Sequence, residues 1–190
     1  MSQPIATTRS ATGIPTGRLA VWWVLASEVV IFGGLLASYL MHRLGHPEWA
    51  NAAAVTNTWI GAFNTLVLLS SSFTAVLAHQ AAEHGDGKKA ARFLLLTMGG
   101  AATFIGVKSF EWTEEISHGF TITSSTFWSF YYVAAGLHAS HVIAGAILMY
   151  YVIRTARQNQ ELHRVELIGI YWHFVDAVWI FLFPLLYIAK

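Results

Sequence analysis

Residues 166–189 read ELIGIYWHFVDAVWIFLFPLLYIA, and this stretch decides the fold class. After Glu166 it holds one histidine, His173, and one carboxylate, Asp176, among apolar and aromatic side chains. A helix needs about 20 mainly apolar residues to cross the hydrocarbon core of a bilayer. Four further stretches qualify, at about residues 19–42, 58–80, 92–113 and 127–153. The sequence therefore predicts an all-α integral membrane protein whose residues 18–190 form a bundle of five transmembrane helices.

The composition supports a membrane protein. Charged residues make up 11% of the chain and hydrophobic residues 55%, whereas soluble domains carry about 25% charged residues. The net charge of +1 argues against a nucleic-acid partner. Because the chain has no cysteine, it forms no disulfide and offers no thiolate to a metal. Residues 1–17 are polar and interrupted by Pro4 and Pro15, which predicts a flexible tail.

The basic residues predict the orientation of the bundle. If all five stretches cross the membrane, the tail and the second and fourth loops share one side. That side carries eight basic residues: Arg9, Arg18, Lys88, Lys89, Arg92, Arg154, Arg157 and Arg164. The other side carries two, Arg43 and Lys190. Lys and Arg are concentrated on the cytoplasmic side of membrane proteins, so we expect a cytoplasmic N-terminus and a periplasmic C-terminus.

Five ionisable side chains fall near the middle of the predicted spans: Glu28, His138, His141, His173 and Asp176. A charge at that depth costs about 2.5–3.5 kcal/mol even on the insertion scale, so such residues usually find partners or have a function. His138 and His141, like His173 and Asp176, are three residues apart and share a helix face. His141 and Asp176 come out at similar depth on consecutive antiparallel helices. We therefore expect a hydrogen bond between them within an intramembrane polar network.

Three histidines and two carboxylates would also suffice as metal ligands, so a metal site and a proton-handling role stay open beside the structural network, which we favour. Glu28 differs from the other ionisable residues in having no charged partner on its own helix. Its helix neighbours are apolar: Val24, Leu25, Ile31 and Phe32. Such a setting favours the neutral carboxylic acid. Both a packing role, with a hydrogen bond to another helix, and a functional role remain for Glu28.

Lys108 and Glu111 lie near the predicted periplasmic end of the third span, followed by Trp112. A lysine there can extend its ammonium toward the headgroups while its stem stays in hydrocarbon. We expect these three residues to contact lipid or a protein interface, with Lys108 and Glu111 forming a surface ion pair.

Five motifs follow one another along the chain: SEVVIFGG at 27–34, NTLVLLSSS at 64–72, KSFEW at 108–112, GLHASHVIAG at 136–145 and YWHFVDAVWIFLFPLLY at 171–187. Together they resemble subunit III of the haem–copper respiratory oxidases, in the same order and over roughly residues 18–189. The long form of that family has seven helices. This chain is similar to its shorter, five-helix bacterial form.

The resemblance implies a non-catalytic accessory subunit of a proton-pumping terminal oxidase in the bacterial inner membrane. The complex would reduce oxygen to water with electrons from cytochrome c or quinol. Haem and copper would belong to partner chains, with no active site, cofactor or metal in this one. Subunit I would pack directly against it, subunit II would be present, and bound phospholipid is expected. The resemblance makes Glu28 the carbodiimide-reactive carboxylate linked to proton or oxygen supply.

Three alternatives remain. Within the resemblance, the chain is a related subunit of a quinol oxidase or nitric oxide reductase complex. In another class, it is a small proton channel or transporter that uses Glu28, His141 and Asp176 as a relay, although five helices do not make the paired inverted halves usual in transporters. A membrane metalloenzyme built on the histidines is a third hypothesis.

Overall fold

The structure is a computed structural model that describes residues 16–46 and 49–189. Most of the predicted tail and Lys190 lie outside the described residues. The helices in chain order are α1 (Thr16–Gly45), α2 (Trp49–Val55), α3 (Thr58–Glu83), α4 (Gly87–Ser117), α5 (Thr126–Ala156), α6 (His163–Phe183) and the π-helical turn η2 (Pro184–Ile188). Five spans are long and apolar enough to cross a membrane: α1, α3, α4, α5, and α6 continued by η2. The predicted five-helix, all-α membrane protein is confirmed.

Helix α3 begins at the predicted residue, whereas α4 and α5 begin before the predicted apolar stretches, and polar side chains cap all three helices. Asn57 accepts hydrogen bonds from the backbone N–H groups of Trp59 and Ile60 at the start of α3. Asp86 does the same for Lys89 in α4. Such caps satisfy backbone donors that the first helical turn leaves free. The polar first turns therefore belong to the helices, although their hydropathy resembles that of loops.

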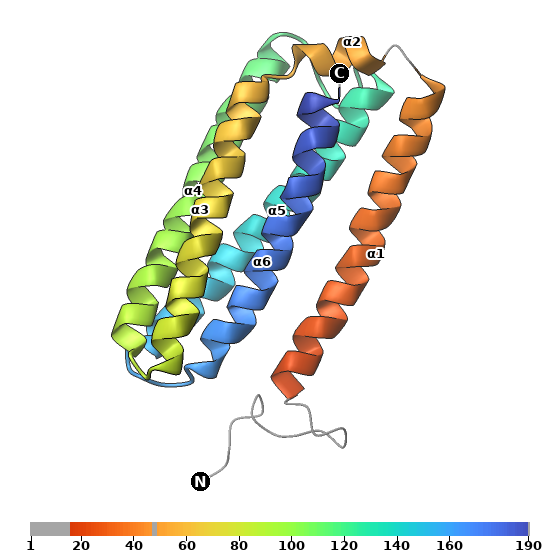
Figure 1. Cartoon of the computed structure of the whole chain (residues 1–190). Helices are drawn as coiled ribbons and strands as arrows, with labels where there is room; N and C mark the ends of the chain where they lie inside the picture. The colour runs from red at the N-terminus through yellow and green to blue at the C-terminus, as the bar shows by residue number, and fades with distance from the viewer. Residues whose placement is uncertain (1–15, 47–48, 190) are drawn as a thin grey trace.

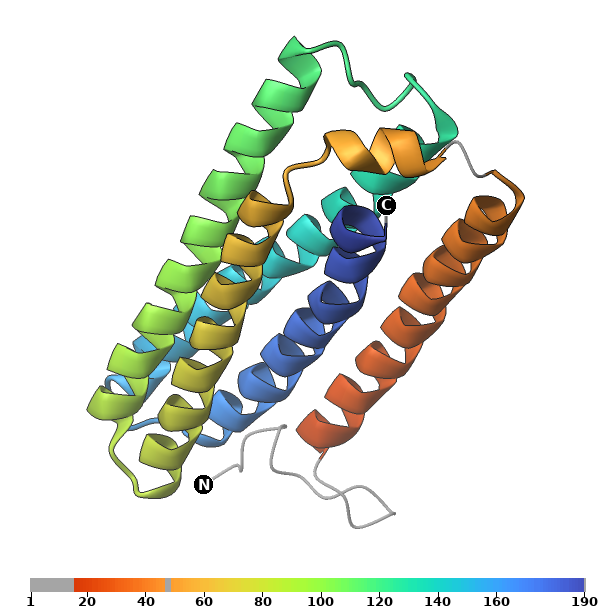
Figure 2. The same cartoon turned by 45° about the horizontal axis from the view of Figure 1, so that its top comes forward.

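Helix α2 was not predicted. It covers one end of the molecule (Figures 1 and 2) and buries Trp49 and Ala53 against the neighbouring helices. The ring of Trp49 packs against Tyr39 at 5.5 Å and against Phe130 at 5.7 Å. Seven residues are too few to show a helical period in the sequence, so the tertiary contacts of Trp49 hold this helix in place.

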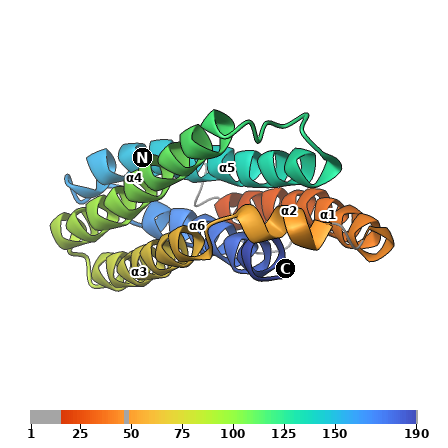
Figure 3. The ribbon, with the colours of Figure 1, turned by 90° about the horizontal axis from the view of Figure 1, so that it is seen from above.

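The two ends of the bundle differ. The start of α1 and the α3–α4 and α5–α6 loops lie at one end, which we call the amino-terminal end (Figure 1). Helix α2, the α4–α5 loop and η2 lie at the other, the carboxyl-terminal end. Seen from above, α3 and α4 occupy one side of the molecule and α1 the other (Figure 3). Helices α3 to α6 pack extensively on one another, whereas α1 mainly contacts α6.

Helix α1 is held along one narrow stripe. It buries Leu25, Phe32 and Tyr39, which are spaced seven residues apart. Polar contacts add to the stripe at both ends: Arg18 lies 2.5 Å from Glu166 of α6, and the hydroxyl of Tyr39 donates to the carbonyl of Leu185 in η2 at 2.7 Å. Leu35 and Leu36 are partly buried beside this stripe, and most of the remaining α1 surface, including Trp23, is exposed. Helix α1 therefore makes few contacts with the other helices, so each polar contact contributes to holding it in position.

Helices α3 and α4 pack closely because α4 has a glycine at the crossing point. A Cβ atom added to Gly100 would lie 2.6 Å from Cβ of Ser71 on α3. The next residue toward the N-terminus, Gly99, faces open space. Small residues allow helix backbones to approach in this way within membranes.

We expect Gly100→Val to destabilise the protein by about 1–3 kcal/mol, the usual cost of overpacking a tight contact. Gly99→Val is the matched control, because it adds the same helix-disfavouring side chain to the same helix without a clash. Thermal unfolding in detergent, followed by circular dichroism, compares the two. Equal midpoints for both variants would contradict the close α3–α4 contact.

Candidate functional site

Glu28 of α1 and His141 of α5 meet inside the membrane-spanning part. Oε2 of Glu28 lies 3.0 Å from Nε2 of His141, and each side chain is 16% exposed. This is ion-pair distance, although the angles do not satisfy hydrogen-bond geometry. Phe32 covers the imidazole edge-on at 5.3 Å, and the hydroxyl of Tyr171 donates to the backbone carbonyl of His141 at 3.3 Å. We call Glu28 and His141 the α1–α5 pair.

The surroundings of His141 determine which ring nitrogen faces Glu28. Nδ1 lies 2.8 Å from the carbonyl oxygen of Leu137. A carbonyl only accepts, so Nδ1 carries a hydrogen and Nε2 faces Glu28. An uncompensated charge is costly in a low-dielectric medium, so the closeness of an acid and a base suits this site.

The prediction of a hydrogen bond between His141 and Asp176 is wrong. His141 turns toward α1, whereas the carboxylate of Asp176 is 4% exposed and lies near the hydroxyl of Ser72 on α3. Each of the two residues lies near the middle of its helix. The direction in which each side chain leaves its helix differs, and the sequence alone does not give the rotation of a helix about its axis.

The residues of the expected intramembrane network, His138, His141, His173 and Asp176, do not form one connected group. His173 and Asp176 both approach Ser72 of α3, whereas His138 and His141 have other neighbours. His138 is fully buried between the rings of Phe104, at 5.4 Å, and Trp179, at 5.0 Å.

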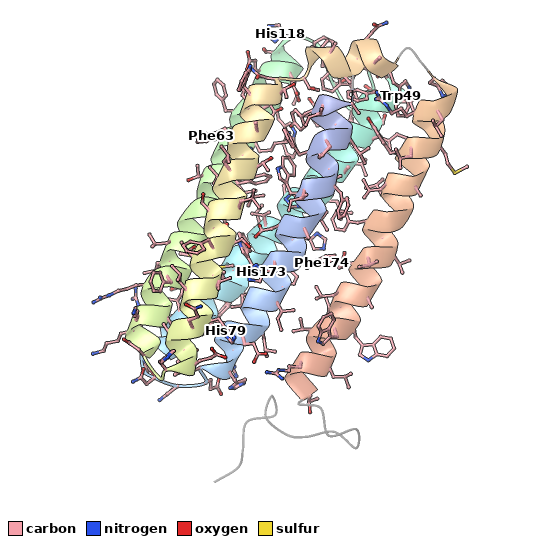
Figure 4. All side chains as sticks on the ribbon, viewed as in Figure 1. Trp49, Phe63, His79, His118, His173 and Phe174 are labelled. Carbon is pink, nitrogen blue, oxygen red and sulfur yellow. The ribbon has the colours of Figure 1, made fainter. Side chains whose placement is uncertain are left out.

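His173 reaches from α6 to α3, where its Nδ1 lies 2.6 Å from Oγ of Ser72 (Figure 4). The described residues include no group of three or more His, Asp or Glu side chains that could hold a metal ion. The histidines point in three directions, which argues against the metalloenzyme hypothesis.

Lys108 and Glu111 do not form the expected surface pair. Lys108 is 1% exposed and Glu111 2% exposed. The ammonium of Lys108 donates to Oε2 of Glu111 at 3.0 Å and to the hydroxyl of Tyr131 at 2.8 Å, and it also contacts the hydroxyl of Tyr187. Trp112 is half-buried against the core instead of facing lipid, with its ring 5.6 Å from the ammonium. Internal partners thus hold Lys108 inside the bundle and replace the headgroup contact.

Glu115 completes this buried group, which we call the Lys108 cluster: Lys108, Glu111, Glu115, Tyr131 and Tyr187. The hydroxyl of Tyr131 lies 2.8 Å from Oε1 of Glu115, and the hydroxyl of Tyr187 donates to Oε1 of Glu111 at 2.8 Å. Sequence reasoning missed Glu115, Tyr131 and Tyr187. The spacing of Lys108, Glu111 and Glu115 at i, i+3 and i+7 was a usable signal, because it puts all three on one helix face.

A polar pocket of about 230 Å³ connects the Lys108 cluster with the carboxyl-terminal end of the bundle. Glu111 and Glu115 line its inner part, and Glu114 and His118 its outer part. His118 marks this end in Figure 4. The cluster is therefore buried beneath a polar entrance and is not sealed in hydrocarbon.

Five apolar spans with paired charges between them define a multi-pass integral membrane protein. Residues 7–190 match the family described as Cytochrome c oxidase subunit III. The chain is 35% identical to a cytochrome c oxidase subunit 3 of Thermostichus vulcanus, over 86% of this chain and 83% of that one. It is 34% identical to a cytochrome c oxidase subunit 3 of Corynebacterium diphtheriae, over 87% and 84%. The chain belongs to the cytochrome c oxidase subunit III family.

A third relative has a different organisation. The heme-copper oxidase subunit I+III of Aeropyrum pernix is 31% identical over 90% of this chain, which corresponds to 22% of that longer protein. Its name joins subunits I and III in one polypeptide.

We expect Lys108→Met to destabilise the protein by about 3–5 kcal/mol, because it leaves buried carboxylates without their cation. The double variant Lys108→Met/Glu111→Gln should recover part of that loss. Lys88→Met, which removes an exposed cation from the same helix, should stay within about 0.5 kcal/mol of wild type. Thermal unfolding in detergent measures all three. A double variant no more stable than Lys108→Met would contradict the pairing.

Proposed function

We propose that this chain is subunit III of a haem–copper terminal oxidase, a non-catalytic accessory subunit that packs against subunit I. The complex would reduce oxygen to water with electrons from cytochrome c, and it would pump protons. The observation that carries this proposal is the family match over residues 7–190, together with the fused subunit I+III relative. Two subunits that exist as one polypeptide in a relative are expected to be neighbours when they are separate chains.

The proposed partners follow from this placement. Subunit I would cover part of the exposed apolar surface, and subunit II would belong to the same complex. Haem and copper would be held by the partner chains. Both bacterial relatives are cytochrome c oxidase subunits, which favours a cytochrome c oxidase over a quinol oxidase or a nitric oxide reductase.

We further propose that the amino-terminal end faces the cytoplasm of a bacterial cell and the carboxyl-terminal end the periplasm. The charge asymmetry of eight basic residues against two supports this orientation. The arrangement of the helices agrees, because the start of α1 and the α3–α4 and α5–α6 loops lie together at one end (Figure 1).

The α1–α5 pair supports a role in proton supply. Oε2 of Glu28 and Nε2 of His141 are 3.0 Å apart, so a proton supplied to this pair would move from oxygen to nitrogen without changing the net charge of the site. Desolvation opposes creating a net charge in a membrane, so a neutral pair of this kind is suited to accept and release a proton. The pair also lies at the seam between α1 and the bundle, where a partner or lipid would be close to it.

The proton-channel alternative is less well supported by the geometry. It required Glu28, His141 and Asp176 to act in series. His141 contacts Glu28, but its expected contact with Asp176 is not formed. The relay is therefore interrupted between His141 and Asp176.

Purification of the tagged chain from its host membranes in mild detergent tests the main proposal. We expect a large haem-containing chain to co-purify in fixed proportion, with oxygen-reducing activity and a visible haem spectrum. Recovery of this chain without any haem protein, from membranes that contain an active oxidase, would contradict the assignment.

Within such a complex, we expect Glu28→Gln to assemble normally, because the amide is nearly isosteric and needs no charge compensation. Initial oxygen uptake should be close to wild type, since the chemistry belongs to subunit I. The amide cannot release a proton, so activity should be lost several-fold sooner in sustained turnover, and carbodiimide labelling of this position should disappear.

Glu114→Gln is the matched control, because it changes an exposed carboxylate at the carboxyl-terminal end. It should match wild type in oxygen uptake, in endurance and in the labelling of Glu28. If Glu28→Gln keeps full endurance and wild-type Glu28 resists the carbodiimide, then Glu28 serves packing alone.

A further inference from the structure

Two exposed histidines lie four residues apart at the carboxyl-terminal end of α1. His42 is in the last turn of the helix, and His46 directly follows its last residue, Gly45. The chain keeps turning at this point, because the backbone N–H of His46 donates to the carbonyl oxygen of Arg43 at 3.2 Å. Residues four apart on a helix share one face. The two imidazole rings are therefore neighbours on the surface of this end.

The two rings are held in the same way. Nδ1 of His42 lies 2.9 Å from the carbonyl oxygen of Ser38, and Nδ1 of His46 lies 2.8 Å from the carbonyl oxygen of His42. Since a carbonyl only accepts, each Nδ1 carries a hydrogen, and in the neutral ring each Nε2 keeps a lone pair. A metal-binding histidine has this arrangement, with one nitrogen on the ion and the other donating to a carbonyl group.

The separation of the rings suits a shared ion. The ring centres of His42 and His46 lie 6.4 Å apart, and the ring planes differ by 14°. Zinc binds an imidazole nitrogen at about 2.0–2.1 Å, which places the centres of two rings on one ion roughly 5–6.5 Å apart. The observed separation lies at the upper end of this range. Both side chains are exposed, so rotation of the side chains can direct the two Nε2 atoms to one ion without movement of the helix.

Trp49 of α2 forms a fixed wall beside both rings (Figure 4). Its ring centre lies 6.3 Å from that of His42 and 6.0 Å from that of His46. Trp49 itself is buried, and it packs against Tyr39 and Phe130. The ring of His42 also contacts Phe130 at 5.3 Å. These contacts restrict the imidazoles before an ion binds, which lowers the entropy cost of binding.

The position at the end of a helix favours a cation. The last carbonyl groups of a helix carry a partial negative charge, so a positive ion is stabilised at the carboxyl-terminal end of α1. The adjacent cation, Arg43, turns toward the buried stripe of α1, where its guanidinium donates to the hydroxyl of Tyr39 at 3.4 Å. The exposed face that carries the two histidines is therefore left to another cation.

We propose that His42 and His46 together bind a divalent transition-metal ion of the zinc class. Imidazole nitrogens suit zinc, copper and nickel, whereas magnesium and calcium prefer oxygen ligands. Since the described residues form no group of three or more such ligands, water fills the other positions of a tetrahedral ion. The ion joins the last turn of α1 to the residue that follows it. It thereby stabilises the end of a helix that makes few contacts with the bundle.

Zinc binding to the intact purified complex, washed with a chelator, tests the proposal. Equilibrium dialysis against zinc ions, followed by elemental analysis, counts the bound ions. We expect His42→Gln and His46→Gln each to bind one zinc ion fewer than wild type. His84→Gln is the matched control, because Nδ1 of His84 lies 2.7 Å from the carbonyl oxygen of Gln80, but no histidine is four residues away. This variant should bind as many zinc ions as wild type.

Hydrogen exchange measured by mass spectrometry separates chelation by both histidines from binding at one of them. Zinc should slow exchange several-fold in peptides covering residues 39–46 of wild type and of His84→Gln, and magnesium should not. In His42→Gln and in His46→Gln, zinc should leave this exchange unchanged. Equal zinc counts in all variants, or a loss in only one of the two histidine variants, would overturn the proposal. Zinc binding that leaves exchange at residues 39–46 of wild type unchanged would overturn it as well.

Discussion

The buried charge of Lys108 is the constraint on which the carboxyl-terminal half of the bundle depends. An ammonium in a low-dielectric interior must be paired and hydrogen-bonded, because its desolvation costs several kcal/mol. This cost is comparable to the net free energy of unfolding of a whole domain. Glu111 supplies the opposite charge from α4, Tyr131 a hydroxyl from α5 and Tyr187 a hydroxyl from η2. Three elements therefore have to meet at one point. The π-helical turn that begins at Pro184 carries Tyr187 to that point.

Helix α1 follows a different principle. It is attached by a narrow apolar stripe and by polar contacts at three depths, through Arg18, Glu28 and Tyr39. Since little apolar surface is buried between α1 and the other helices, the hydrophobic effect contributes little there, and lipid tails would solvate both faces equally well. Polar contacts then decide where α1 sits. The middle contact, Glu28 with His141, consequently has a structural task in addition to the proposed role in proton supply.

The sequence was sufficient for the number and order of the five membrane-spanning helices, because hydropathy and a rise of 1.5 Å per residue determine these. It was insufficient for the partners of His141 and Lys108. The partners of a side chain depend on how its helix is rotated about its own axis. That rotation is determined by packing against several other helices. The same limit explains why α2 was missed, since Trp49 holds it by tertiary contact. The motif around Glu28 singled out that residue, and the structure adds that His141 lies 3.0 Å from its carboxyl group.

The contrast between the two buried acid–base groups bears on what each can do. The Lys108 cluster combines an ammonium with two carboxyl groups and two phenols, so several contacts hold each proton and moving one disturbs them all. The α1–α5 pair consists of one carboxyl group and one imidazole, and the backbone carbonyl of Leu137 contacts the other nitrogen of His141. Fewer contacts would change if a proton moved within this pair, and α1 itself is weakly held. A proton-handling role therefore fits Glu28 and His141, while the Lys108 cluster fits a structural role that keeps α4, α5 and η2 together beside them.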